Sequence, residues 1–220
     1  MRQHVNPLSR FFQLPIEIPQ VKDLFANIDL PIHLDIGCAK GRFLLDLASL
    51  DTTWNYLGIE IRNKLVLSAK KDKDRLKLAN LNFSYCNANV SLEKWLNTLN
   101  HGNLRRVSIQ FPDPWFKRRH YKRRVLQPSL LLSLIKSFKP GAELFLQSDV
   151  FSVIKPMIDL VDSSQCFTRE PLNDFEWLDE NPFSVVTERE HYAMANQLKI
   201  YRVLYRRNAN DINLSGIFKR

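Results

Sequence analysis

The sequence is poor in cysteine and has no long apolar run, and both shortages narrow the class of protein. Three cysteines, Cys38, Cys86 and Cys166, stand far apart in the 220-residue chain. An odd and dispersed set predicts no disulfide framework and fits a reducing compartment. No apolar run approaches the roughly 20 residues that a membrane-spanning helix needs. The first residues also lack the apolar core of a signal peptide, so we expect a cytoplasmic protein.

The sequence also lacks a cluster of histidines and has fewer acidic than basic residues. The five histidines show no ligand spacing, so we expect no metal site. Asp and Glu number 23 against 32 Lys and Arg, which gives a net charge of +9. A basic excess of this size favours an anionic partner, either nucleic acid or an acidic membrane surface.

The chain is long enough for one α/β domain with a sizeable core. Residues 1–22 are irregular and contain three prolines, so we expect an N-terminal arm, with a single domain over residues 23–220. Apolar patterning predicts strands at residues 32–36, 56–61, 81–85, 107–111, 143–147 and 199–205. It predicts helices at 41–50, 62–79, 91–99 (capped by Ser91), 128–138 and 150–161, and a loop-rich region at 163–190.

This alternation predicts a mostly parallel sheet covered by helices on both faces. Ligands of such sheets bind beyond the carboxyl ends of the strands, so the residues that follow each strand are the candidates for a site.

The first predicted strand runs into HLDIGCAKGRFL, where Gly37 and Gly41 bracket a tight turn and Asp35 precedes it. The G-x-A-x-G spacing is one residue shorter than the dinucleotide fingerprint. An acid at this place suits a cationic ligand group better than a pyrophosphate. The alternative is a generic turn in which Asp35 helps to cap the next helix.

Glu60 ends the second strand, where an acid accepts hydrogen bonds from both ribose hydroxyls; the alternative is a surface glutamate. Asn87 follows the third strand, where its amide could meet an adenine edge; the alternative is a turn residue. A cation acceptor, a ribose acceptor and an adenine reader together match the three parts of S-adenosylmethionine. NAD would require the pyrophosphate cradle that this turn does not offer.

The segment FPDPWFKRRHYKRR follows the fourth strand. Pro112 and Pro114 restrict the backbone around Asp113, and Trp115 and Phe116 could form an aromatic pocket. The alternative is a proline-rich turn packed on the domain. Six of the last eight residues of the segment are Lys or Arg and none is acidic, as expected for a phosphate-binding surface. A solvated charged face is the usual alternative, and a membrane contact is disfavoured because no apolar face accompanies the charge.

Together LDIGCAKG, GIE, FPDPWFKRRHYKRR and a downstream TERE resemble the bacterial tRNA (guanine-N7)-methyltransferase family from about residue 30 to the C-terminus. The resemblance implies a Rossmann-like class I methyltransferase fold, with a seven-stranded, mostly parallel sheet, an antiparallel last strand and helices on both faces. It also implies methyl transfer from S-adenosylmethionine to N7 of the variable-loop guanine of tRNA. We expect a monomer or homodimer that acts without metal or membrane.

The resemblance also carries residue roles over by position. Asp113 would be catalytic, and the cofactor site would comprise Asp35, Gly37, Gly41, Glu60, Asn87 and Asp113. The substrate site would comprise Lys117, Asp149, Thr187, Glu188, Arg189 and Glu190, and RNA would contact Arg119, His120, Tyr121, Lys122, Arg123 and Arg124. The chain departs from the family pattern at Asp35 (usually Glu), Ala39 (usually Gly), Asn87 (usually Asp) and Ser148 (usually Thr).

Several alternatives stay open. On pattern alone Asp149 could equally cap a helix, and Thr187-x-x-Glu190 fits a capping box as well as a guanine-binding loop. The function could instead be methylation of another RNA or of a protein. A non-catalytic RNA-binding module of the same fold is a different class of alternative, favoured by Ala39 and Asn87. A nucleotide-dependent dehydrogenase fits less well.

Overall fold

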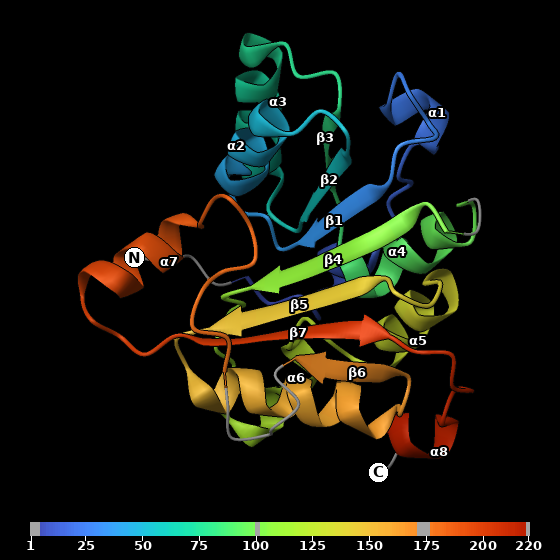
Figure 1. Cartoon of the computed structure of the whole chain (residues 1–220), viewed down its shortest axis with the longest axis vertical. Coiled ribbons are helices and arrows are strands. Elements are labelled where there is room, and N and C mark those ends of the chain that lie inside the picture. The colour runs from blue at the N-terminus through green and yellow to red at the C-terminus, as the bar shows by residue number, and fades with distance from the viewer. Residues whose placement is uncertain (1–4, 100–101, 171–176, 219–220) are drawn as a thin grey trace.

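A computed structural model describes residues 5–99, 102–170 and 177–218 of the chain. Its centre is a seven-stranded sheet with the order β3-β2-β1-β4-β5-β7-β6 (Figure 1). The neighbours from β3 to β5 run parallel, whereas β7 is antiparallel to both β5 and β6. The strands are β1 (Ile32–Ile36), β2 (Asn55–Glu60), β3 (Leu81–Tyr85), β4 (Leu104–Gln110), β5 (Glu143–Ser148), β6 (Phe167–Glu170) and β7 (Tyr201–Arg207).

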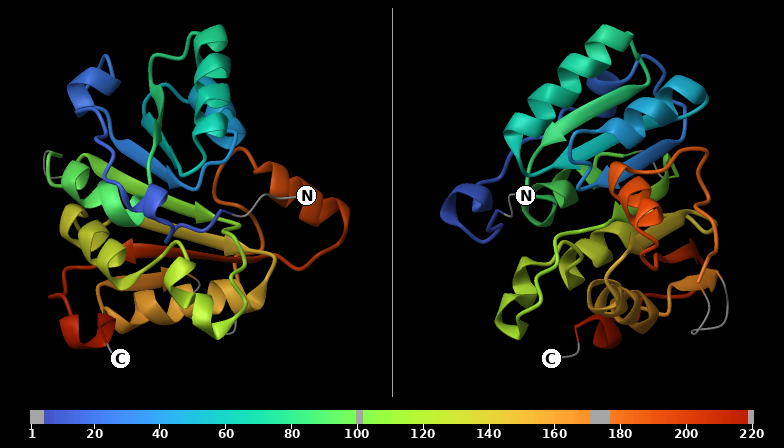
Figure 2. Two further views of the ribbon diagram at one scale, coloured as in Figure 1. Left: turned by 180° about the vertical axis from the view of Figure 1, so that it is seen from behind. Right: turned by 90° about the vertical axis from the view of Figure 1, so that its left-hand side faces the viewer.

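Helices cover both faces of the sheet. Each face carries its own apolar core, because alternate side chains of a strand point to opposite faces. In β1, Leu34 packs in the larger core, whereas the ring of His33 points to the other face and contacts Phe43 of α2. The larger core includes residues of α4, α5 and α6, and the smaller one includes residues of α2 and α3 (Figure 2). The helices are α1 (Val21–Leu24), α2 (Arg42–Leu50), α3 (Asn63–Leu76), α4 (Ala88–Leu96), α5 (Pro128–Ser137), α6 (Phe151–Ser163), α7 (Glu188–Ala195) and α8 (Leu214–Ile217), with 3-10 turns η1 (Arg10–Gln13) and η2 (Arg118–Arg123).

The fold predicted from the sequence is confirmed, with several local corrections. The helix predicted from Ser91 begins earlier, because Asn87 is its N-cap and accepts a hydrogen bond from the backbone of Asn89. Ser91 is therefore buried inside α4. The region predicted to be loop-rich contains the edge strand β6 and the start of α7, while residues 171–176 lie outside the described residues. The fourth strand begins three residues before the predicted start, at Leu104, and ends one residue before the predicted end, at Gln110.

The described part of the N-terminal arm packs on the domain along α4 (Figure 2). The backbone of Ile16 donates to Ser91 Oγ at 2.9 Å, and Trp95 Nε1 donates to the carbonyl of Pro19 at 2.9 Å. Residues 1–4 of the predicted arm lie outside the described residues. Within the described part of the chain, no helix has the length and apolarity required to cross a membrane.

Candidate functional site

The residues that the sequence singled out after the strands gather at the carboxyl edge of the parallel sheet. Asp35 and Glu60 lie near the carboxyl ends of the adjacent strands β1 and β2, and the charge of Glu60 contributes to the raised pKa of Asp35. Asp113 follows β4 and interacts electrostatically with Arg62, which follows β2. The edge therefore brings carboxylates from three consecutive positions of the sheet into one region.

The turn after β1 has a left-handed backbone at three positions: Gly37 (φ 87°), Ala39 (φ 52°) and Gly41 (φ 71°). A Cβ at Gly41 would clash with the ring of Phe83, so close packing requires glycine there. A Cβ at Gly37 would have no neighbour within 4 Å, so the backbone there is open to a ligand. Ala39 adopts the left-handed conformation at a cost of about 1 kcal/mol, because its Cβ crowds the carbonyl oxygen.

Asp35 is a buried carboxylate, only 4% exposed, at the centre of this edge. It accepts hydrogen bonds from Ser108 Oγ at 2.6 Å and from Gln110 Nε2 at 3.3 Å. Burial, and then the charge of Glu60, raise the pKa of Asp35 to about 6, although the two hydrogen bonds oppose the increase. Ser108 also contacts His33 Nε2 at 2.9 Å. Side chains of β4, and not the backbone of α2, hold Asp35, so its interpretation as a helix cap is wrong.

Glu60 is also buried, so the interpretation as a surface glutamate is wrong. It accepts from the backbone of Ala39 at 2.9 Å and from the backbone of Arg62 at 3.0 Å. The Arg62 guanidinium adds two further hydrogen bonds, from Nε at 2.9 Å and from Nη2 at 3.1 Å. The bond to Glu60 raises the pKa of Arg62, and Asp113 adds attraction. Arg62 is thus a site residue that the sequence reasoning missed.

Asn87 has two roles in the structure, and both engage its side chain. Its Oδ1 caps α4, a role that the sequence suggested for Ser91. Its Nδ2 donates to the carbonyls of Pro7 and Phe12 in the N-terminal arm, each at 3.1 Å. The arm therefore occupies the amide that we predicted to read adenine, and that role stays a prediction.

The loop that carries Asp113 begins with a strained residue. Phe111 has φ 45° although it is not glycine and precedes Pro112. Both features disfavour this conformation, and strain of this kind concentrates at functional sites. The Phe111 backbone donates to the carbonyl of Gln147 in β5 at 2.8 Å, which ties the loop to the sheet. Asp113 lines a small hollow with Pro112, Trp115, Arg124, Val125, Val153 and Met157.

The basic segment, residues 117–124, contains the 3-10 turn η2 and lies next to this hollow. Lys117 precedes η2, and the segment 117–119 is exposed. The Arg123 guanidinium lies over the Trp115 ring at 5.0 Å, and the His120 ring contacts the edge of the same indole at 5.5 Å. In the described residues, no carboxylate forms an ion pair with any side chain from 117 to 124. The positive charge of the segment therefore remains available to a polyanion.

Asp149 lies between β5 and α6 and forms an ion pair with Arg189 of α7. The N-cap of α6 is Val150, so the interpretation of Asp149 as a helix cap is wrong. Glu188, the first residue of α7, pairs with Arg42 of α2 at 3.1 Å on the surface. The structure therefore brings the predicted substrate residues of α7 to the carboxyl edge of the sheet.

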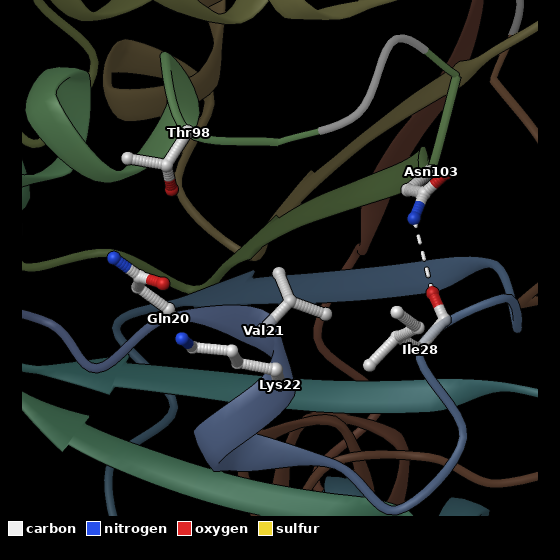
Figure 3. A pocket seen from close by; sticks show the side chains of 6 residues that line it. All are labelled: Gln20, Val21, Lys22, Ile28, Thr98 and Asn103. Atoms are coloured by element: carbon white, nitrogen blue, oxygen red, sulfur yellow. Dashed lines mark hydrogen bonds between the residues drawn. The ribbon is translucent and has the colours of Figure 1, made fainter.

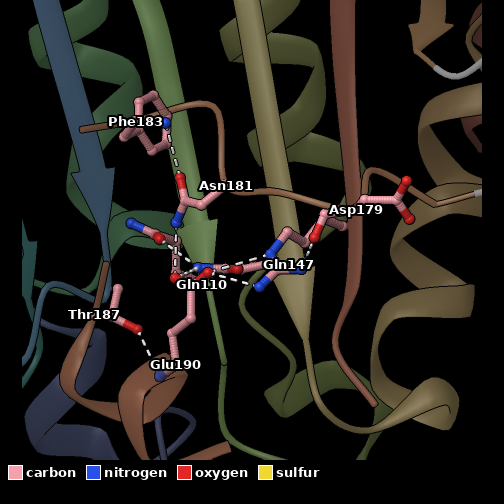
Figure 4. A network of polar contacts seen from close by, with 8 residues as sticks. Gln110, Gln147, Asp179, Asn181, Phe183, Thr187 and Glu190 are labelled. Atoms are coloured by element: carbon pink, nitrogen blue, oxygen red, sulfur yellow. Dashed lines mark hydrogen bonds and ion pairs between the residues drawn. The ribbon is translucent and has the colours of Figure 1, made fainter. Parts of the chain in front are cut away.

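Glu190 anchors the start of α7 in a buried polar network (Figure 4). Thr187 Oγ1 accepts from its backbone at 3.1 Å, so the capping interpretation of this pair is correct for Thr187. The Glu190 carboxylate instead accepts from Arg202 Nη2 at 2.8 Å, from Gln147 Nε2 at 3.0 Å and from Asn181 Nδ2 at 2.7 Å. Glu190 is fully buried, and its carboxylate binds the framework rather than solvent.

A larger hollow lies away from this edge (Figure 3). Asn103 precedes β4, and its Nδ2 donates to the carbonyl of Ile28 at 3.1 Å, so the hollow lies where β1 and β4 begin. None of the described residues that line it carries a carboxylate, thiol or imidazole group. Its lining residues are Gln20, Val21, Lys22, Ile28, Thr98 and Asn103.

Comparison with known proteins agrees with this geometry. A protein-family model described as "Putative methyltransferase" matches residues 29–203. A tRNA (guanine-N(7)-)-methyltransferase of Prochlorococcus marinus (strain MIT 9303) is 60% identical over 209 residues, which cover 94% of this chain and 88% of the relative. The protein of that name from Parasynechococcus marenigrum (strain WH8102) is 56% identical over 212 residues, with coverages of 96% and 90%.

The fold also has a counterpart among solved structures. Precorrin-6y C5,15-methyltransferase from Geobacter metallireducens GS-15 superposes with a TM-score of 0.52 over 85% of each chain. The sequence identity is 9%, so this similarity concerns the fold alone.

Proposed function

Since the chain belongs to the tRNA (guanine-N(7)-)-methyltransferase family, we propose that it transfers a methyl group from S-adenosylmethionine to N7 of the variable-loop guanine of tRNA. The observation that carries the proposal is the loop from Phe111 to Arg124. It joins a carboxylate at the carboxyl edge of the sheet directly to an exposed basic segment. A small base carried by a large polyanion requires this combination.

The residues at the edge fit the methyl donor. Asp35 is a buried acceptor for its ammonium group, and the open backbone at Gly37 leaves room beside the turn. Glu60 would accept the ribose hydroxyls, and Asn87 would bind the adenine edge. The bound donor supplies an electrophilic sulfonium methyl group.

Two of these side chains must first release other partners. A carboxylate has about four acceptor positions, and Glu60 already accepts four hydrogen bonds from Arg62 and Ala39. Two of the four come from the Arg62 guanidinium, which therefore has to withdraw for a ribose to bind. Asn87 similarly has to release the carbonyls of the arm.

Guanine N7 has an in-plane lone pair and no proton, so its methylation needs no obligatory base. The tasks of the protein are alignment and electrostatic stabilisation. Positive charge moves from sulfur to the purine as the methyl group is transferred. We assign Asp113 to positioning the guanine and stabilising this developing charge, supported by its place beside the cofactor edge and the basic segment.

Selection of guanine requires acceptors for its N1–H and N2–H₂ groups. Asp149 and Glu190 are the candidates, and Asp149 is the more available of the two. Among the described residues it is held by Arg189 alone, whereas Glu190 accepts from three side chains. The base must leave its stack to be read, at a cost of about a few kcal/mol.

The basic segment from Arg119 to Arg124 would bind the phosphates of the tRNA, with Lys117, Thr187, Glu188 and Arg189 nearer the target nucleotide. We further infer a single catalytic domain over residues 23–220 with an N-terminal arm. The protein would act in the cytoplasm, as a monomer or homodimer.

Tritiated methyl transfer to three acceptors tests the proposal: unmodified tRNA, ribosomal RNA and bulk protein. We expect label in the tRNA alone, with Asp113→Asn as the inactive control. Label in rRNA or protein would favour another methyltransferase of the same fold. Calorimetry with S-adenosylmethionine tests the alternative of a non-catalytic RNA-binding module, which predicts no donor binding.

A further inference from the structure

Two glutamines without a role in the proposed mechanism connect Asp35, on the methyl-donor side of the site, to Glu190, on the tRNA side. Gln110 ends β4, Gln147 lies beside it in β5, and the two residues are register partners. Gln110 Nε2 donates to Asp35 Oδ1 at 3.3 Å, and Gln110 Oε1 accepts from Gln147 Nε2 at 2.6 Å. Gln147 Nε2 also donates to Glu190 Oε2 at 3.0 Å. A continuous hydrogen-bonded bridge thus runs from Asp35 to Glu190. Figure 4 shows its part from Gln110 through Gln147 to Glu190.

The direction of this bridge is set by the acids at its two ends. An ionised carboxylate only accepts hydrogen bonds, so Gln110 must turn its N–H group toward Asp35 and its oxygen toward Gln147. Gln147 must then use its own N–H group for both Gln110 and Glu190. As a consequence Gln147 Oε1 is buried and finds no hydrogen-bond partner in the described part of the chain. A buried oxygen without a hydrogen bond is unfavourable. The orientation of both carboxamides is therefore set by the two acids and not by the hydrogen bonding of Gln147 itself.

The bridge has a discrete alternative. Rotation of both carboxamides by half a turn exchanges their donors and acceptors, so that Gln110 donates to Gln147 and Gln147 turns its oxygen toward Glu190. That state gives Gln147 Oε1 a donor and moves Gln147 Nε2 to the buried position without a partner. It also removes one donor from each acid, while Asp35 keeps the bond from Ser108 and Glu190 keeps those from Arg202 and Asn181. Two discrete arrangements whose balance both ends influence are the physical basis of coupling between sites.

We propose that Gln110 and Gln147 are positioning residues that couple binding of the methyl donor at Asp35 to binding of the guanine nucleotide beside Glu190. The ammonium group of a bound donor favours ionised Asp35, which keeps the N–H group of Gln110 turned toward Asp35. Gln147 then keeps its bond to Glu190, which fixes the start of α7 in the arrangement that receives the base. The identity of the two ligands rests on the proposed function.

The test measures the affinity of unmodified tRNA with and without S-adenosylhomocysteine, which carries the ammonium group and transfers no methyl. In the wild type we expect the nucleoside to tighten tRNA binding by about 5-fold or more, the lower end of common allosteric coupling. Gln110→Met and Gln147→Met should each reduce this factor to below about 2-fold, and the double variant should add nothing. Gln110 is partly exposed and Gln147 fully buried, so Gln110→Met provides the answer if Gln147→Met does not fold.

Asn181→Ala is the matched control. It removes a different N–H donor from Glu190 and leaves the bridge in place, so coupling should persist. A wild-type factor below about 2-fold, or wild-type coupling in both Met variants, would overturn the inference. Methyl transfer by the wild-type enzyme is measured in parallel. Its absence would refute the proposed function, while the coupling factor would still decide the role of the bridge.

Discussion

Replacement of Asp35 by Asn tests whether the ionised form of this buried acid lowers the free energy of unfolding while it favours ligand binding. The carboxylate is buried, and burial raises its pKa from 3.8 to about 6. Asparagine has almost the same shape, and its Oδ1 can still accept from Ser108 and Gln110. The substitution therefore removes the charge and leaves the known hydrogen bonds to that oxygen in place.

The sign of the pH effect follows from the direction of the pKa change. Between pH 3.8 and about 6 the folded protein holds a proton on Asp35 that the unfolded chain has lost. The free energy of unfolding must therefore fall as the pH rises through this window. The two pKa values differ by about 2 pH units, and each unit is worth about 1.4 kcal/mol, so Asp35 lowers wild-type stability by about 3 kcal/mol above pH 6.

Urea unfolding of both proteins across this range is the assay. The difference in unfolding free energy, wild type minus Asp35→Asn, should fall by about 3 kcal/mol between about pH 3.5 and about pH 7. Contributions of titrating groups that do not interact with Asp35 cancel in the difference. A difference that stays constant with pH, or that rises, would refute the argument that burial of Asp35 disfavours its ionised form.

The same variant should bind S-adenosylhomocysteine more weakly, because it lacks the negative charge that would hold the ammonium group. A hydrogen bond to a charged group contributes about 1.5–3 kcal/mol, so Asp35→Asn should weaken S-adenosylhomocysteine binding at neutral pH by about 10-fold to 100-fold. Calorimetry measures this directly. Wild-type affinity in the variant would show that the ammonium group binds elsewhere.

Three further predictions concern the reaction, the RNA contact and the turn. Asp113→Asn should lower kcat by about 100-fold or more while tRNA affinity stays near the wild-type value in filter binding, and wild-type turnover would remove Asp113 from the mechanism. Neutralising Lys122, Arg123 and Arg124 should reduce the slope of log affinity against log salt by about 2 to 3, whereas an unchanged slope would place the RNA elsewhere. Gly41→Ala should destabilise the fold by about 2–4 kcal/mol, because the added Cβ clashes with Phe83 at a left-handed position; an unchanged Tm would contradict this.

The sequence predicted the parallel part of the sheet well because its signals are local. Strands β1 and β3 have apolar residues at alternate positions, and both were predicted with the observed bounds. The edge strand β6 was missed because its four residues show no apolar pattern and pair only with β7, which follows in the chain more than 30 residues later.

In the candidate site too, local contacts could be predicted from the sequence and long-range contacts could not. Thr187 was predictable as a cap because its bond to the backbone of Glu190 spans three residues. The partners of the Glu190 carboxylate were not predictable, since Arg202 and Gln147 reach it from β7 and β5. Ser108 and Gln110 offered one usable signal: they are polar residues two positions apart in an otherwise apolar strand end, which places them on one face of β4.

The most direct test of the account is to map the methylated nucleotide in tRNA that the wild-type protein has labelled in vitro. We expect label at N7 of a single guanine in the variable loop, and an initial rate of labelling lower by about 100-fold or more with Asp113→Asn, although that variant still binds the tRNA. Label at another nucleotide or another ring atom, or equal labelling by the variant, would contradict it.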